Sequence, residues 1–388
     1  MFFPITVDVL IIGGGIAGLW LLDDLRRKGY SALLVESKAL GSGQTIAAQG
    51  ILHGGVKHLL VGRSASFVDA LQSMPSVWRD CLDGVREPDL RDVRLRSGHC
   101  VCWRTSSLLS FLGLMGARFV MQSGVRVIAE SERPLPLREC TGDVYRVNEQ
   151  VIDPSSLLSV FAKRNQTYLL KSKGLRFYYE IPANIACVDV FSPDGESWCE
   201  VTATTIVLTA GEGNAALRTS CGLSSQLMRR LPLPILVMSG DLPDLNGFCL
   251  EGHRAKVIIT THRISKRFAV WQIASEQLVE NGETFESLVT RELREAMPGF
   301  SWGDVTVDSY EVNRAEGITG SSMRSNDAHV VKEGNVITAW PTKLVLAPRL
   351  SERVMELLPS PSFTDDAASR GVSVWPRPHV AAFPWDSK

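Results

Sequence analysis

A glycine-rich turn that directly follows a short apolar run constrains the fold of this chain more than any other feature. Residues 7–12, Val-Asp-Val-Leu-Ile-Ile, are typical of a parallel strand buried on both faces. The turn Gly-Gly-Gly-Ile-Ala-Gly occupies residues 13–18, and apolar residues between 16 and 28 recur with helical spacing. Residues 32–35, Ala-Leu-Leu-Val, predict a second strand that closes with Glu36. Strand, turn, helix, strand and acid in this order within about 30 residues predict a dinucleotide-binding unit.

Each glycine of the turn has its own task in such a unit. Gly13 allows the tight turn from strand to helix, Gly15 leaves room for a pyrophosphate to approach the backbone, and Gly18 lets the helix pack closely on the sheet. The N-terminus of the helix offers N–H groups and the positive end of its dipole to the phosphates. Glu36 is placed to accept hydrogen bonds from the ribose hydroxyls, which disfavours a 2′-phosphate but does not separate NAD from FAD.

The composition is that of an ordinary globular protein. The chain has 388 residues, of which 45% are hydrophobic and 21% charged, and a formal net charge of -1. This length predicts about two or three domains. Because the net charge is close to zero and no long run of one sign occurs, we expect no nucleic-acid partner.

The cysteines and the apolar stretches indicate a cytoplasmic protein. None of the eight cysteines forms a C-x-x-C pair, so we expect reduced thiols and no metal site. The first residues show no charged region followed by an apolar one, and thus no secretory signal. The most apolar stretch, residues 108–121, contains Arg118 and is shorter than the roughly 20 residues of a membrane span. We expect a buried or interface helix there and no transmembrane segment.

Four later segments resemble one family. Residues 40–55, Leu-Gly-Ser-Gly-Gln-Thr-Ile-Ala-Ala-Gln-Gly-Ile-Leu-His-Gly-Gly, resemble the loop after the second strand in FAD-dependent oxidoreductases of the D-amino-acid oxidase (DAO) superfamily. The closest echo is the "I-H-x-G" element of the glycerol-3-phosphate and L-2-hydroxyglutarate dehydrogenase branches. Residues 151–158 resemble the "V-D-P-x-x-L" helix start of the family, with Asp153 and Pro154 as cap and first-turn residue. Residues 206–211 resemble its "A-x-G" strand end, and residues 335–348 resemble its C-terminal strand, loop and helix.

The resemblance implies an α/β fold: a Rossmann-like FAD-binding domain joined to a discontinuous antiparallel-sheet substrate domain, as in two-domain flavoproteins of the glutathione-reductase type. We expect the FAD-binding domain in residues 1–62, 141–215 and 311–358, the substrate domain in 63–140 and 216–310, and an extended tail in 359–388 that Trp375 and Trp385 pin to the surface. Residues 255–273 alternate as half-buried antiparallel strands do, and residues 94–103 predict another strand of that sheet. Residues 281–297 predict an amphipathic helix, and a further helix is expected to end at about Leu358.

FAD is the cofactor that the resemblance favours, since the loop of small residues has to run close under a flavin ring. The residues expected to contact FAD come from the glycine turn, the second strand end, the loop, the "A-x-G" element and the C-terminal loop: Gly13, Gly15, Ile16, Ala17, Gly18, Glu36, Ser37, Gln44, Thr45, Gln49, Gly50, Ala210, Gly211, Pro341, Thr342, Lys343 and Leu344. A positive helix start at the C-terminal loop would stabilise charge on reduced flavin.

The reaction that the family implies is removal of a hydride from a carbon bearing an amine or hydroxyl, with delivery to flavin N5. His53 is the first candidate to lie beside the flavin and accept a proton, although it could equally bond loop backbone or carry covalent flavin. Arg314 could bind a substrate carboxylate or phosphate, or only pair with Glu311 or Glu316. Lys343 could reach flavin or substrate, or be solvated. His262 could line the substrate pocket, although surface exposure is the simpler expectation for it and for its neighbour Arg263.

Residues 45–49, Thr-Ile-Ala-Ala-Gln, lack the serine-arginine pair of the glycerol-3-phosphate branch, so a small 2-hydroxy acid or amino acid is favoured over a phosphate ester. Gln49 could bond flavin, substrate or loop backbone. The electron acceptor (oxygen, a quinone or a protein) stays open. Two other functions stay open as well: a flavin monooxygenase, and an accessory subunit that holds FAD without chemistry.

Overall fold

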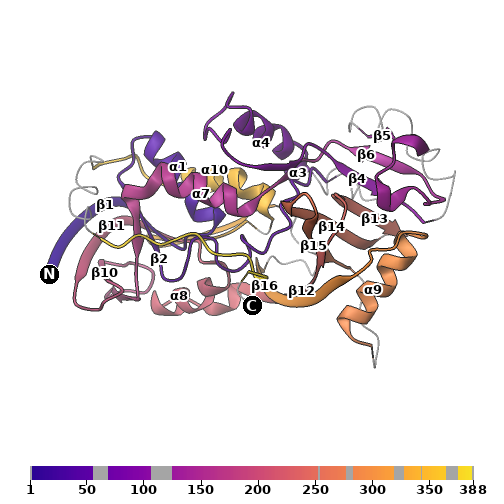
Figure 1. Cartoon of the computed structure of the whole chain (residues 1–388). Coiled ribbons are helices and arrows are strands. Elements are labelled where there is room, and N and C mark those ends of the chain that lie inside the picture. The colour runs from indigo at the N-terminus through magenta and orange to yellow at the C-terminus, as the bar shows by residue number, and fades with distance from the viewer. Residues whose placement is uncertain are drawn as a thin grey trace.

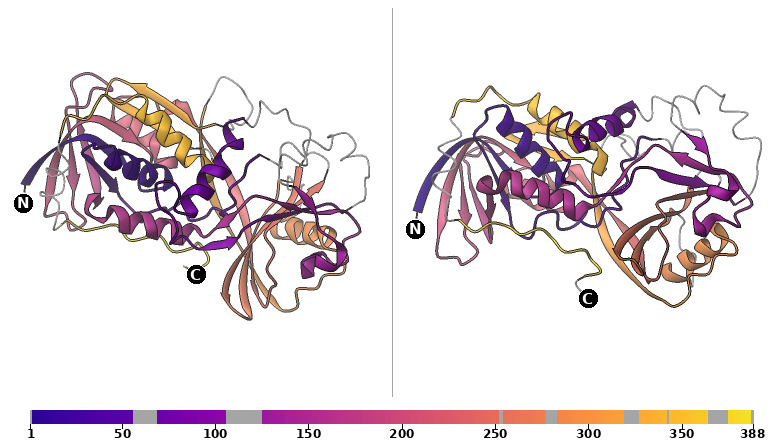
Figure 2. Two further views of the ribbon diagram at one scale, coloured as in Figure 1. Left: turned by 90° about the horizontal axis from the view of Figure 1, so that it is seen from above. Right: turned by 45° about the horizontal axis from the view of Figure 1, so that its top comes forward.

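The computed structural model describes residues 2–55, 69–105, 125–251, 254–276, 283–318, 327–341, 343–363 and 375–386. Two large β-sheets organise these residues into two neighbouring lobes, and the chain passes between the lobes several times (Figures 1 and 2). The expected helix in residues 108–121 lies outside the described residues. Within the parts of the chain that the structure describes, no helix is long and apolar enough to cross a membrane.

The first sheet contains the predicted dinucleotide-binding strands. Parallel pairing joins β1 to both β2 and β11, β2 to β8, and β11 to β18. The strands follow one another in the order β17 (His329–Glu333), β18 (Val336–Trp340), β11 (Trp198–Leu208), β1 (Phe2–Ile12), β2 (Ala32–Glu36) and β8 (Leu169–Lys171), with β10 (Cys187–Phe191) on β11 and β9 (Gly174–Tyr178) on β10. The strands predicted at residues 7–12 and 32–36 are therefore confirmed.

Helices cover one face of this sheet. They are α1 (Ile16–Arg27), α4 (Met74–Leu82), α7 (Pro154–Asn165) and α10 (Ala347–Met355); the short α3 (Asp69–Gln72) precedes α4. Trp20 of α1 is buried between α4 and α7. Its ring centroid lies 4.8 Å from that of Trp78 on α4 and 5.5 Å from that of Phe161 on α7. The predicted helix at residues 16–28 is thus confirmed as α1, and α10 ends three residues before the expected Leu358. Strands β9 and β10 and helix α8 (Asn214–Ser220) cover the other face.

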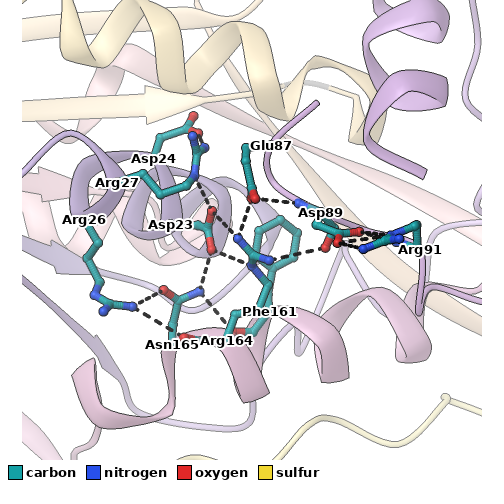
Figure 3. A network of polar contacts seen from close by, with 10 residues as sticks. All are labelled: Asp23, Asp24, Arg26, Arg27, Glu87, Asp89, Arg91, Phe161, Arg164 and Asn165. Atoms are coloured by element: carbon teal, nitrogen blue, oxygen red, sulfur yellow. Dashed lines mark hydrogen bonds and ion pairs between the residues drawn. The ribbon is translucent and has the colours of Figure 1, made fainter. Parts of the chain in front are cut away.

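A polar network fixes α1 against α7 and the loop that follows α4 (Figure 3). Arg164 of α7 donates to Asp23 of α1 at 2.8 Å and to Glu87 at 2.7 Å, and Arg27 donates to Asp23 at 2.8 Å. Burial acts to raise the pKa of Asp23, but the hydrogen bonds from Arg164 and Arg27 outweigh burial and lower it. The network holds the helix layer together on the side away from the second sheet and needs no chemical role.

The second sheet is antiparallel except for the parallel pair of β4 and β13. Its order is β16 (Val305–Gly317), β12 (Met228–Gly240), β15 (Phe268–Ala274), β14 (Arg254–Ser265), β13 (Gly247–Glu251), β4 (Cys100–Trp103), β6 (Val144–Val147) and β5 (Arg126–Val127). Helix α9 (Phe285–Ala296) packs on its outer face, with Val289 and Leu293 against Trp103 and Trp271. The predicted helix at residues 281–297 is confirmed as α9 within the described residues.

Two expectations about this sheet are wrong. Residues 94–103 are not one strand, since β3 (Leu95–Ser97) pairs with β7 (Val151–Ile152) in a separate ladder and only β4 joins the second sheet. Strands β14 and β15 are buried on both faces rather than half-buried. Side chains of residues 255–273 alternate between the two faces of the sheet, and both faces are buried. Helix α9 covers the outer face, and the loop at residues 44–53 covers part of the inner face.

The C-terminal tail runs along both lobes (Figure 2). Trp375 is buried in the first lobe and donates to the Lys171 carbonyl at 2.8 Å. Residues 379–381 form a parallel bridge with Leu40, and Phe383 then reaches the second sheet, where it packs against His262.

The expected domain boundaries remain a proposal. Strand pairing favours placing residues 144–147 and 305–317 with the second sheet rather than dividing the chain at residues 141 and 311.

Candidate active site

The glycine turn at the end of β1 shows which of its glycines the protein itself requires. A Cβ on Gly13, whose φ is +117°, would lie 2.5 Å from the Ala210 Cα, and a Cβ on Gly18 would lie 2.1 Å from the Gly13 carbonyl oxygen. A Cβ on Gly15 would meet one atom, the Thr45 hydroxyl oxygen, at 3.3 Å. Protein packing therefore explains Gly13 and Gly18, whereas Gly15 keeps its side open for a ligand.

The end of β2 lies beside the glycine turn and is hydrogen-bonded to it. The two carboxylate oxygens of Glu36 accept hydrogen bonds from the backbone N–H groups of Gly14 at 2.7 Å and Lys38 at 2.6 Å. The Thr45 hydroxyl accepts from the N–H of Ile16 at 3.2 Å, at the start of α1. The Ser37 carbonyl accepts from the Lys171 ammonium at 2.8 Å. Ala17 is buried in the first turn of α1, so only its backbone could face a cofactor.

The loop of small residues, 44–50, is tied to the second sheet by side-chain amides. The Gln44 amide oxygen accepts from the N–H of Ala315 on β16 at 2.9 Å, and the Gln49 amide nitrogen donates to the carbonyls of Ile258 and Gln272 at 2.9 Å each. Gly50 has a φ of +79°, and a Cβ there would lie 2.0 Å from the Ile152 carbonyl. The loop is therefore held between the two lobes in one path.

The C-terminal loop lies beside the end of β11. Trp340 is fully buried and donates to the Met228 sulfur at 3.3 Å, and Lys343 caps a short 3-10 turn that begins at Leu344. Pro341 and Lys343 are partly exposed, and Thr342 lies outside the described residues. Across from them, the Ala210 N–H donates to the Asn214 side chain at 2.8 Å, and Gly211 has a φ of +59° with little protein around its Cα.

Arg314 lies on the inner face of β16, one residue from the Gln44 contact. Its Nε is 2.8 Å from a carboxylate oxygen of Glu316, and Arg229 on β12 donates to the other oxygen at 3.0 Å. Glu316 is buried, whereas Arg229 and Arg314 are partly exposed. Two guanidinium groups thus share one carboxylate, so these three side chains together carry one net positive charge. Of the two partners considered from the sequence, the structure shows Glu316.

His53 lies at the other end of the loop. Its Nδ1 is 3.1 Å from a carboxylate oxygen of Glu149, and the other oxygen of Glu149 accepts from the Gly54 N–H at 2.7 Å. The His53 ring centroid is 6.4 Å from that of Phe248 on β13. His53 therefore lies beside β13 and Arg314 lies on β16, and β12, β15 and β14 stand between these two strands in the second sheet.

His262 is buried, and the expectation of surface exposure for it is wrong. Its Nδ1 lies 2.8 Å from an Arg96 nitrogen and 3.3 Å from an Asp153 oxygen, and its ring packs against Phe383 at a centroid distance of 4.7 Å. Arg263, the next residue, points outward and pairs with Asp244 at 2.7 Å. The structure gives His262 a place in the junction between the lobes.

Sequence reasoning did not find three residues of the inner face: Glu149, Arg229 and Tyr310. The Gln272 amide nitrogen donates to the Tyr310 hydroxyl at 2.6 Å and to the Ala47 carbonyl at 2.6 Å, so Tyr310 reaches the loop. Burial raises the pKa of Tyr310 beyond its usual range, so this phenol stays neutral. No local pattern marks these residues, because each is placed by strand register or by a long-range contact.

A parallel sheet that ends in this glycine turn, joined to a second sheet that holds the following loop, defines the class of two-domain dinucleotide-binding proteins. The residues fit the pyrophosphate of FAD on one structural observation: among the glycines at positions 13, 15 and 18, Gly15 alone faces no protein backbone, and its one neighbour is the Thr45 hydroxyl at 3.3 Å. Residues of the turn, Glu36, the loop and the end of β11 would hold the cofactor.

Comparisons with known proteins agree with this class. Residues 8–241 match the model of the family described as FAD dependent oxidoreductase, DAO. The chain is 33% identical over 394 residues to a probable FAD-dependent oxidoreductase, PA4991, from Pseudomonas aeruginosa, covering 98% of each chain. The crystal structure of PA4991 superposes with a TM-score of 0.82 over 100% of this chain and 99% of the other. The chain therefore belongs to the DAO family of FAD-dependent oxidoreductases and is an enzyme that uses FAD.

More distant structures share the fold. A glycine oxidase from Geobacillus kaustophilus is 16% identical, with a TM-score of 0.65 over 92% of this chain and 96% of the other. A glycerol-3-phosphate dehydrogenase from Bacillus halodurans, complexed with FAD, is 15% identical, with a TM-score of 0.54 over 96% of this chain and 66% of the other.

Proposed function

We propose that the enzyme oxidises a small acid whose reacting carbon bears an amine or a hydroxyl group. The observation that carries this proposal is the net positive charge formed by Arg229, Arg314 and the buried Glu316 beside the loop at residues 44–50. A guanidinium in this position can bind a carboxylate through two parallel hydrogen bonds.

In this scheme the substrate loses a hydride and a proton. The chemistry that bound FAD would supply is that of a hydride acceptor. Arg314 binds the substrate carboxylate and orients the reacting carbon, and His53 accepts the proton that leaves the amine or hydroxyl. Lys343 is a second cation at the C-terminal loop that would add to the attraction for an anion.

The loop composition disfavours phosphate esters, because residues 45–49 carry no cation. Proteins with this fold include a glycine oxidase and an L-proline dehydrogenase. Amino and imino acids are therefore the first substrates to test, followed by 2-hydroxy acids.

The test is anaerobic reduction of the FAD-loaded protein by a panel of amino acids, imino acids, 2-hydroxy acids and glycerol 3-phosphate. We expect at least one acid from the first three groups to bleach the flavin absorbance. Reduction of the flavin by dithionite but by no acid in the panel would contradict the proposal. Bleaching by glycerol 3-phosphate alone would show that the substrate class is wrong.

With an active acid in hand, Arg314→Gln is expected to raise the substrate concentration for half-maximal bleaching by about 10-fold to 100-fold, since a charge-assisted pair contributes on the order of 1.5–3 kcal/mol. Arg267→Gln is the matched control. Arg267 is 90% exposed at the turn between β14 and β15, and its loss should leave bleaching unchanged. Equal effects of the two variants would remove Arg314 from the substrate site.

A further inference from the structure

A buried carboxylate lies directly behind His53. The side chain of Glu149 is 1% exposed, whereas that of His53 is 29% exposed. One carboxylate oxygen accepts from the Gly54 N–H at 2.7 Å, and the other lies 3.1 Å from His53 Nδ1. The two ring nitrogens of His53 therefore differ, because Nδ1 alone faces the buried acid.

The backbone around this pair holds both residues in place. Ile51 forms an antiparallel bridge with Val151, and the Leu52 N–H donates to the Gln150 carbonyl at 2.9 Å. This short ladder sets His53 beside Glu149 without relying on the side-chain contact. Phe248 of β13 lies against the His53 ring and adds an apolar neighbour.

Two buried thiols on β4 also lie within the electrostatic influence of Glu149. Burial, and then the charge of Glu149, raises the pKa of Cys100 well above its usual range, and burial raises the pKa of Cys102 as well. Both thiols thus stay neutral and add no charge beside the carboxylate. Among the described residues, His53 and the Gly54 N–H are the hydrogen-bond partners of the Glu149 carboxylate.

The protonation of the pair follows from hydrogen-bond chemistry. An ionised carboxylate is an acceptor only, so a hydrogen bond from His53 to Glu149 requires the proton on Nδ1. A neutral imidazole with its proton on Nδ1 has its lone pair on Nε2. Carboxylate partners fix the tautomer and orientation of functional histidines in this way.

We propose that Glu149 is the positioning residue of this site: it holds the neutral imidazole of His53 in the tautomer protonated on Nδ1 and so leaves Nε2 as the acceptor for the substrate proton. The tautomer is a property of this chain alone. The role of Nε2 in the reaction rests on the proposed function.

The experiment measures the tautomer directly. The FAD-loaded protein is labelled with ¹⁵N in its seven histidines, and the imidazole nitrogens are recorded over a pH series that extends to alkaline pH; His53→Gln identifies the signals by their loss. We expect His53 to show a protonated Nδ1 and an unprotonated Nε2. A predominant Nε2–H tautomer in the wild-type protein would overturn the proposal.

Two variants test the cause. Glu149→Gln keeps the size of the side chain but lacks the negative charge, so the His53 population is expected to move toward the Nε2–H tautomer. Glu130→Gln, at an exposed position on a 3-10 turn, is the control and should leave the His53 signals unchanged. An unchanged tautomer in a folded Glu149→Gln protein would also overturn the proposal. If Glu149→Gln does not fold, the wild-type spectrum decides the question.

Turnover provides the link to the reaction. With a substrate that bleaches the flavin, Glu149→Gln is expected to lower kcat about 10-fold to 100-fold with little change in KM, which is less than the roughly 100-fold to 10,000-fold effect of a general base itself. If the wild-type protein shows the Nδ1–H tautomer but Glu149→Gln leaves kcat unchanged, Glu149 still positions His53. The role of His53 as the base would then be contradicted. The two proposals can therefore fail separately.

Discussion

At the residue scale, the glycines of the turn look alike in the sequence, but each position requires glycine for a different physical reason. Gly13 combines a left-handed φ of +117° with backbone contact to the Ala210 segment, and Gly18 faces the Gly13 carbonyl. Gly15 has an ordinary φ of -75° and an open side. We therefore expect a side chain at Gly15 to take up space that FAD needs, whereas a side chain at Gly18 would collide with the Gly13 carbonyl.

Two alanine substitutions separate these reasons. Gly15→Ala is expected to change the free energy of unfolding of the flavin-free protein by less than about 1 kcal/mol but to weaken FAD binding at least 10-fold. Gly18→Ala is expected to destabilise the flavin-free protein by about 1–3 kcal/mol through overpacking. Urea unfolding of flavin-free protein and FAD titration measure the two quantities. Equal loss of stability in both variants would contradict the assignment.

At the scale of elements, Asp153 joins the start of α7 to the ladder of β3 and β7. One carboxylate oxygen caps α7 by accepting from the Ser156 N–H at 2.8 Å, and the other accepts from Arg96 of β3 at 3.1 Å. The predicted helix cap is thus confirmed, and it has a second task. Burial acts to raise the pKa of Asp153, but the His262 and Arg96 contacts and the Ser156 N–H lower it far below its usual value of 3.8.

This lowered pKa predicts a pH dependence of stability. Because the unfolded chain takes up the proton first on acidification, the contribution of Asp153 is complete above about pH 4 and is lost as the pH falls toward the folded-state pKa. Asp153→Asn keeps an oxygen for the helix cap but leaves Arg96 buried without its counter-charge, at a cost of about 3–5 kcal/mol. Urea unfolding at several pH values should show this loss and a flatter acid limb.

Asp80→Asn, at an exposed position on α4, is the matched control for that experiment. It should leave both the free energy of unfolding and its pH dependence unchanged. An acid limb in Asp153→Asn as steep as in the wild type would show that other carboxylates dominate.

At the scale of the whole molecule, the tail fastens the two lobes to each other. Residues 375–381 are bonded to the first lobe at Lys171 and Leu40. The rings of Phe383 and Trp385 then stack at a centroid distance of 4.7 Å. Phe383 packs against His262, and the Trp385 ring centroid lies 6.3 Å from that of Tyr310. Tyr310 and Gln272 also bind the Ala47 carbonyl in the loop at residues 44–50. The tail therefore packs on the same face of the second sheet that holds this loop.

Phe383→Ala is expected to lower the free energy of unfolding by about 3–5 kcal/mol, because the ring is buried between lobes. Hydrogen exchange should then increase at the end of β14 around His262. Phe363→Ala is the control on the same tail, where the side chain is 38% exposed, and it should change neither quantity. Unaltered exchange in Phe383→Ala would mean that the tail does not hold the lobes together.

Local patterns in the sequence determined the dinucleotide-binding unit and the segments around it. The period of the apolar residues located β1, α1 and β2, and the Asp153-Pro154 pair located the start of α7, because such signals act over a few neighbouring residues. The resemblance of residues 40–55 to the DAO family pointed to FAD. The break between β3 and β4 was missed, since it depends on pairing with β7, more than 50 residues later in the chain.

Only the tertiary structure decided which charges meet. Arg314 and Arg229 share Glu316 because of the register of β12 and β16, and His53 meets Glu149 because residues 51–52 pair with residues 150–151. The burial of His262 depends on a tail that returns from the far end of the chain. A side chain carries its chemistry in the sequence, but its hydrogen-bond partner and its exposure are set by long-range packing, which no local period encodes.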